Sequence, residues 1–122
     1  MDSTLSDASI RARFGETGDF IARELSCGGQ TVYAYMIDGL VAGATASETV
    51  FRPLSRMEPD TMDGLYCRAR DGFIYNSVAD AVTDPDAAVS KLVNGFCVVL
   101  FPGAGAVAYE VKSPEKRSIS PP

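Results

Sequence analysis

The chain has 122 residues and a mass of 13.0 kDa, a size that predicts one domain with an ordinary hydrophobic core. Hydrophobic residues make up 46% of the chain and charged residues 22%, which is a globular composition. With 16 acidic and 11 basic residues the net charge is −5, which argues against binding to nucleic acid or to anionic membrane surfaces.

The N-terminal part is predicted to form a helix followed by a β-hairpin. Apolar residues in 5–14 have a loosely helical spacing, and Ser6 or Asp7 is positioned to cap the helix. The hairpin consists of β-prone runs at 20–25 and 31–37 around a Gly-Gly turn. Both faces of the second run are apolar, so we expect an inner strand that is covered on both sides.

Two helices are predicted in the middle of the chain. The first spans 44–57, where Pro53 predicts a kink or two short pieces, because an interior proline removes a backbone donor. The second is short and spans about 60–69. Its inward-facing residues are expected to be Met62, Leu65 and Tyr66.

A short strand within 73–82 is predicted to precede a third helix after Asp84-Pro85. The aspartate is expected to cap this helix and the proline to occupy its first position. Asn94-Gly95 ends it. The expected buried stripe consists of Ala87, Ala88, Leu92 and Val93.

The C-terminal part is predicted to be a second hairpin. Residues 96–101 form the longest apolar run, far short of the ~20 residues of a membrane-spanning helix, and 106–111 return after a turn. We therefore expect an α+β fold in which helices cover a mixed sheet of two hairpins and a short strand. Residues 1–111 would form the single domain, and the proline-rich residues 112–122 a linker-like tail.

Three cysteines are the first candidates for chemistry. The chain has no histidine, which excludes Ser-His-Asp and Cys-His catalysis and histidine-ligated zinc, and no C-x-x-C pair, so reduced thiols are expected. Cys27 precedes the Gly-Gly turn, but no adjacent cation lowers its pKa and Glu24 opposes ionisation. We interpret Cys27 as a hairpin-turn residue rather than a nucleophile, and Cys67 and Cys97 as core residues.

The remaining polar candidates have structural explanations. Gly103-Ala104-Gly105 is followed by a strand, so it is a hairpin turn and not a dinucleotide-binding loop. The aspartates do not match a calcium loop, and capping and solvation explain them, although an acid–base carboxylate pair stays an alternative. They are Asp60, Asp63, Asp80, Asp84 and Asp86.

Basic and aromatic residues leave two binding hypotheses open. Arg68, Arg70 and Lys116-Arg117 form either an anion or acidic-partner site or, by default, a solvated face. A small-molecule sensor would hold its ligand near the faces of Tyr33, Tyr35 and Tyr109. We assign no catalytic, cofactor-binding or metal-ligating residue, and the ligand-binding residues stay unknown.

Three stretches, taken in order, carry a resemblance to a known family. They are 18–25 with 35–41, the helix end 92–95 before the apolar strand, and 115–121. In this order and spacing the chain resembles the N-terminal region of the GerA family of spore germination proteins, the A subunits of nutrient germinant receptors. It departs from the family pattern at Met36 and in 102–105, and it diverges from the pattern throughout 56–76, to which nothing is carried over.

This resemblance implies a non-catalytic role without cofactors, in receptor assembly or signal transmission. It implies that the intact protein continues past Pro122 into a second subdomain and a bundle of membrane helices, with this part on the cytosolic side of the spore inner membrane. The implied partners are a membrane B subunit that binds the nutrient, a lipoprotein C subunit and further A subunits. The alternative that we retain is a small-molecule-sensing α+β domain.

Overall fold

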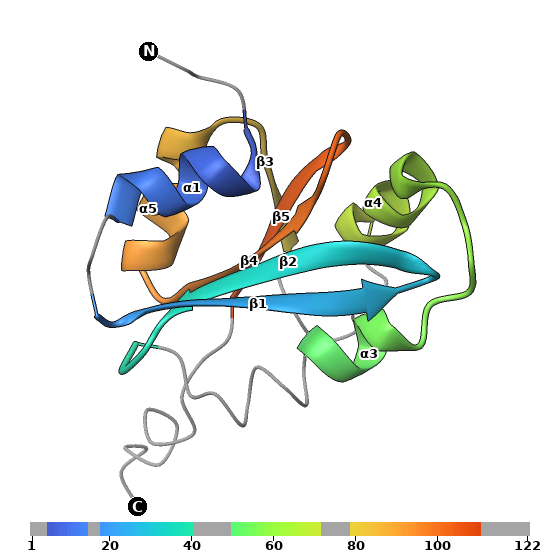
Figure 1. Ribbon diagram of the computed structural model, residues 1–122, viewed down its shortest axis with the longest axis horizontal. Coiled ribbons are helices and arrows are strands. Elements are labelled where there is room, and N and C mark those ends of the chain that lie inside the picture. The colour runs from blue at the N-terminus through green and yellow to red at the C-terminus, as the bar shows by residue number, and fades with distance from the viewer. Residues whose placement is uncertain (1–4, 15–17, 41–49, 72–78, 111–122) are drawn as a thin grey trace, which may run out of the picture.

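The computed structural model describes residues 5–14, 18–40, 50–71 and 79–110. Its centre is a five-stranded sheet with the spatial order β1-β2-β4-β5-β3, in which every pair of neighbours is antiparallel (Figure 1). The strands are β1 (Phe20–Cys27), β2 (Gln30–Ile37), β3 (Ala79–Val82), β4 (Phe96–Phe101) and β5 (Gly105–Glu110). The described helices are α1 (Asp7–Phe14), α3 (Arg52–Ser55), α4 (Met62–Arg70) and α5 (Pro85–Val93).

The α+β class predicted from the sequence is confirmed, whereas the expectation of a mixed sheet is wrong. The two hairpins β1–β2 and β4–β5 are antiparallel because two- and three-residue turns join their strands. The long connection through α3, α4, β3 and α5 then brings β4 back beside β2 in the opposite direction. β3 likewise runs opposite to β5 at the far edge of the sheet.

Helices cover both faces of the sheet. α1 and α5 lie on one face, and α3 and α4 lie on the other (Figure 1). β4 shows the consequence most clearly, because Cys97, Val99 and Phe101 enter the α3/α4 cluster while Val98 and Leu100 enter the α1/α5 cluster. A strand with alternating residues in two cores has to be apolar throughout, which explains the uninterrupted run. β2 lies between β1 and β4, so the predicted inner strand is confirmed.

Local capping explains where the helices begin. At the start of α1, Ser6 and Ser9 exchange hydrogen bonds of 2.9 and 3.1 Å, in which each hydroxyl accepts from the backbone N–H of the other residue. Thr61 caps α4 by accepting from Gly64 N. Asp84 caps α5 as predicted, with Oδ1 2.8 Å from Ala87 N.

The helix predicted at 44–57 is seen only in part. α3 has four residues, with Pro53 in its first turn, where the missing N–H leaves no bond unmade. The predicted residues 44–49 lie outside the described residues, as do 73–78, Val111 and the expected tail 112–122. One member of the predicted stripe is wrong: Val93 is 54% exposed, because it lies in the last turn of α5, beside the C-cap.

Candidate functional site

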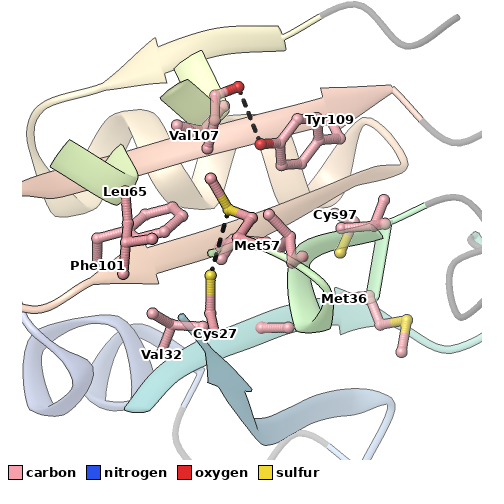
Figure 2. Packing of buried hydrophobic residues seen from close by; sticks show 14 residues of the cluster. Cys27, Val32, Met36, Met57, Leu65, Cys97, Phe101, Val107 and Tyr109 are labelled. Carbon is pink, nitrogen blue, oxygen red and sulfur yellow. Dashed lines mark hydrogen bonds between the residues drawn. The ribbon is translucent and has the colours of Figure 1, made fainter. Parts of the chain in front are cut away.

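The thiols do not form a catalytic centre. Cys27 is the last residue of β1 and is fully buried, with Sγ 3.4 Å from Met57 Sδ (Figure 2). Burial raises the pKa of the Cys27 thiol, and the charge of Arg68 offsets this only in part. Burial also raises the pKa of Cys97 to about 12. Both thiols are therefore protonated at neutral pH and poor nucleophiles.

Cys67 corrects the sequence-based expectation of a core residue. It is exposed on α4, whose buried residues are Leu65 and Ala69. Those two are four positions apart and share one face of the helix, whereas position 67 lies on the opposite side. Cys97 is in the core as predicted.

The three tyrosines of the small-molecule hypothesis do not surround one site. Tyr33 and Tyr35 point into the α1/α5 cluster, whereas Tyr109 belongs to the α3/α4 cluster on the other face. Tyr35 donates to Asp7 Oδ1 at 2.5 Å. Tyr109 donates to the Ala69 carbonyl at 3.1 Å (Figure 2). Burial raises the pKa of both buried phenols. These hydroxyls are used within the fold, where they tie α1 and α4 to the sheet.

The five aspartates are spread over the described structure. Asp80 accepts from Lys91 Nζ at 2.8 Å, Asp86 lies 3.2 Å from Arg13 Nε, and Asp84 is the α5 cap. Asp60 accepts from Thr61 N and Arg68 Nη2, and Asp63 is exposed in the first turn of α4. Among the described residues, no three or more His, Cys, Asp or Glu side chains lie together as metal ligands would.

The predicted turn and basic cluster are also accounted for. Gly103 has φ 84° in the tight turn between β4 and β5, so the hairpin interpretation of 103–105 is confirmed. Arg68 Nη2 bonds Asp60 Oδ2 and the Glu58 carbonyl, at 2.9 and 3.3 Å. The Arg70 guanidinium pairs with Asp71 and lies 5.5 Å from the Tyr66 ring centroid. Lys116-Arg117 lies outside the described residues.

One cleft was not predicted. It has a volume of about 280 Å³ and lies at the β4–β5 turn. Its lining residues are Leu5, Tyr66, Val82, Thr83, Gly103, Ala104 and Gly105. They come from four separate segments, so no local pattern could reveal the cleft. The one local signal is Gly105, where a Cβ would lie 2.8 Å from Cζ of Tyr66.

The comparison with protein families covers nearly the whole chain. Residues 8–122 match the family described as "Bacillus/Clostridium GerA spore germination protein". The chain belongs to the GerA spore germination family. No curated protein matches this GerA-family chain. Within the described residues, no helix is long and apolar enough to cross a membrane.

A solved structure shows the same fold as this GerA-family chain. It is the crystal structure of the N-terminal domain of the A subunit of the Bacillus megaterium spore germinant receptor GerK3. The two share 15% sequence identity with a TM-score of 0.64, over 89% of this chain and 95% of that chain. This likeness concerns the fold, and the match over residues 8–122 confirms the family expected from the sequence motifs.

Proposed function

We propose that this GerA-family chain is the N-terminal domain of the A subunit of a nutrient germinant receptor, and that it acts in receptor assembly or signal transmission. The observation that carries the proposal is the family match over residues 8–122. The fold shared with a germinant receptor A-subunit domain supports it.

The geometry favours a role without catalysis. The buried thiols have raised pKa values, and four of the five candidate aspartates accept a hydrogen bond or contact a basic side chain. The buried tyrosine hydroxyls are bound within the fold. Such a domain offers surfaces and rigidity rather than reactive groups, which suits a structural or signalling part of a complex.

The proposal includes the setting of the domain. Residues 1–111 form the first subdomain of a larger membrane protein, and 112–122 a linker. The domain lies on the cytosolic face of the spore inner membrane. Its partners are the membrane B subunit, the lipoprotein C subunit and further A subunits. The family membership is the support for each of these statements.

The test uses the complete gene in the organism that encodes it. An epitope-tagged full-length protein is expected in the inner-membrane fraction of dormant spores, together with the neighbouring receptor subunits. Deleting residues 8–110 separates the two roles: loss of the B and C subunits from the membrane indicates assembly, and normal subunit levels with a lost nutrient response indicate signalling. A tagged full-length protein found outside the membrane fraction would contradict the proposal.

The cleft beside Tyr66 favours small-molecule sensing as a second candidate function. Its volume of about 280 Å³ suits only a small ligand, and two of its lining residues, Tyr66 and Thr83, are hydroxyl-bearing residues. A thermal-shift screen with amino acids, sugars and nucleosides tests it. A thermal unfolding midpoint that rises with one nutrient, but does not rise in the Thr83→Val variant, would support sensing. A midpoint that no nutrient changes would rule out this candidate.

A further inference from the structure

β1 is an edge strand whose hydrogen-bonding phase can be assigned. It pairs only with β2 in the described sheet. Cys27 and Gln30 face each other across the two-residue turn, so their N–H and C=O groups point toward each other. At the far end Asp38 N donates to the Asp19 carbonyl at 2.7 Å, so residues 19 and 38 are a hydrogen-bonded pair in the same alternation as 27 and 30. Odd-numbered residues of β1 therefore bond β2, and even-numbered residues point outward.

The outward backbone groups of β1 are unused. Those of Phe20, Ala22, Glu24 and Ser26 make no hydrogen bond in the part of the chain that the structure describes. The strand pairs residue by residue with β2 over its full length, so it has no bulge to turn the edge away, and it contains no proline. An edge without a bulge or a proline can serve as a template for one more strand.

Two adjacent charges mark the middle of this edge. Arg23 and Glu24 are exposed, and neither has an ion pair or side-chain hydrogen bond within the described structure. Because side chains alternate along a strand, Arg23 lies on the same face as Ile21 and Leu25, toward α3 and α4. Glu24 lies on the other face, with Phe20.

The same charges disfavour pairing with a second copy. Two copies of β1 can bond only when even-numbered residues face even-numbered residues, since those carry the outward groups. Two antiparallel registers meet this condition and pair nearly the whole strand. One places Arg23 opposite Arg23, and the other places Glu24 opposite Glu24. Like charges directly opposite each other are destabilising. The register that would place Arg23 opposite Glu24 aligns even-numbered residues with odd-numbered residues, so the outward backbone groups of the two strands cannot bond each other.

We propose that the free edge of β1 accepts an antiparallel strand from a different protein chain, in which a basic residue is followed directly by an acidic one. In that arrangement the basic side chain lies opposite Glu24 and the acidic side chain opposite Arg23, each on its own face of the sheet. An apolar residue directly before the basic residue lies opposite the half-buried Leu25, and an apolar residue two positions after the acidic residue lies opposite the half-buried Ile21. This surface goes beyond the proposed receptor role and does not depend on it.

The test is an NMR titration of the isotope-labelled chain with synthetic peptides whose ends are acetylated and amidated. The matched peptide is acetyl-Thr-Val-Lys-Glu-Thr-Val-Thr-amide. Two control peptides carry Lys-Lys or Glu-Glu in place of Lys-Glu. Whichever direction the peptide strand runs, Lys-Lys places a lysine opposite Arg23 and Glu-Glu places a glutamate opposite Glu24. We expect backbone amide shifts at Phe20, Ala22, Glu24 and Ser26, and about fivefold tighter binding of the matched peptide. N-methylation of the threonine opposite Ala22 is expected to abolish binding, because it removes an interstrand donor.

A charge substitution separates the edge from general electrostatics. Arg23→Glu is expected to make the Lys-Lys peptide the tightest of the three, whereas Arg56→Glu, an equal change of net charge at an exposed residue outside β1, leaves the order unchanged. No binding at millimolar peptide, shifts outside β1, or equal affinity for all three peptides would overturn the proposal. So would the same inversion in Arg56→Glu.

Self-exclusion is tested by removing the two charges. Arg23→Thr with Glu24→Thr is expected to form dimers in analytical ultracentrifugation at a concentration where the unaltered chain is monomeric. The matched control, Arg56→Thr with Asp63→Thr, removes one charge of each sign from exposed positions elsewhere and is expected to stay monomeric. Dimers of the unaltered chain that form through β1 would contradict the argument against a second copy.

Discussion

Gly28→Ala is the substitution whose effect the structure predicts most sharply. Gly28 and Gly29 form the β1–β2 turn with φ 56° and 80°. A Cβ at Gly28 would lie 2.7 Å from Leu65 Cδ2 and 2.8 Å from the Glu58 carbonyl oxygen, whereas one at Gly29 meets nothing within 4 Å. The two positions thus share the backbone cost and differ in the steric cost.

The backbone cost is common to both variants. A non-glycine residue in the left-handed region loses about 1–2 kcal/mol, and the stiffer unfolded chain returns about 0.4–1 kcal/mol, so Gly29→Ala is expected to cost about 1 kcal/mol. At Gly28 the overlap with the Glu58 carbonyl cannot be relieved by a rotamer change, because that oxygen belongs to the backbone. Overpacking of this kind adds about 1–3 kcal/mol, so Gly28→Ala is expected to cost about 3 kcal/mol.

Urea unfolding followed by far-UV circular dichroism measures the difference. The midpoint is expected to fall with an unchanged slope in both variants, and about three times further in Gly28→Ala. Equal losses would refute the reasoning, since they would mean that the hairpin turn does not pack against α4 and residue 58 as the structure has it.

Three further predictions concern tyrosine and cysteine side chains. Tyr35→Phe removes the donor to Asp7 and is expected to cost about 1–2 kcal/mol in urea unfolding; an unchanged midpoint would contradict that role. A maleimide is expected to label Cys67 in the folded chain and Cys27 only after unfolding, and equal rates would contradict the burial. The pKa of Cys97 rises from 9.0 to about 12 on folding, so the unfolded state binds fewer protons between these values and stability falls there by about 1.4 kcal/mol per pH unit. Thermal melts across pH 8–11 are expected to show a shallower decline in Cys97→Ala, and identical slopes would contradict it.

Elements with their own local chemistry were predictable from the sequence. The Gly-Gly turn between β-prone runs predicted β1 and β2, and Asp84-Pro85 predicted the start of α5, because turns and caps depend on residues close in sequence. The apolar run at 96–101 predicted the strand β4, and the apolar faces of 31–37 predicted that β2 is an inner strand. These signals agree with the final structure because each depends on residues that are close in sequence and not on distant contacts.

What the sequence did not reveal depends on distant contacts. The spacing of α4 places Cys67 opposite Leu65, but only the packed helix shows which face is buried. Tyr35 and Tyr109 look equivalent in sequence, yet strand pairing directs them to opposite faces of the sheet. The antiparallel placement of β4 beside β2 likewise follows from a crossover that no local pattern encodes.

The candidate site shows the same limit. No residue pattern pointed to the cleft at the β4–β5 turn, since Leu5, Tyr66 and Thr83 come from separate segments. The functional conclusion came instead from ordered motifs spread along the chain, and the match over residues 8–122 confirmed the family.

The nutrient response of spores tests the central claim most directly. Spores that carry the full-length gene with Gly28→Ala are compared with Gly29→Ala spores by the fall in optical density after nutrient addition. The comparison is made at a temperature between the thermal midpoints of the two domains, where only the Gly28→Ala domain is unfolded. We expect the response to the receptor's nutrient to be lost or strongly slowed in Gly28→Ala and close to normal in Gly29→Ala. An undiminished response to every nutrient in Gly28→Ala spores, with the domain shown to be unfolded, would contradict a role in germinant reception.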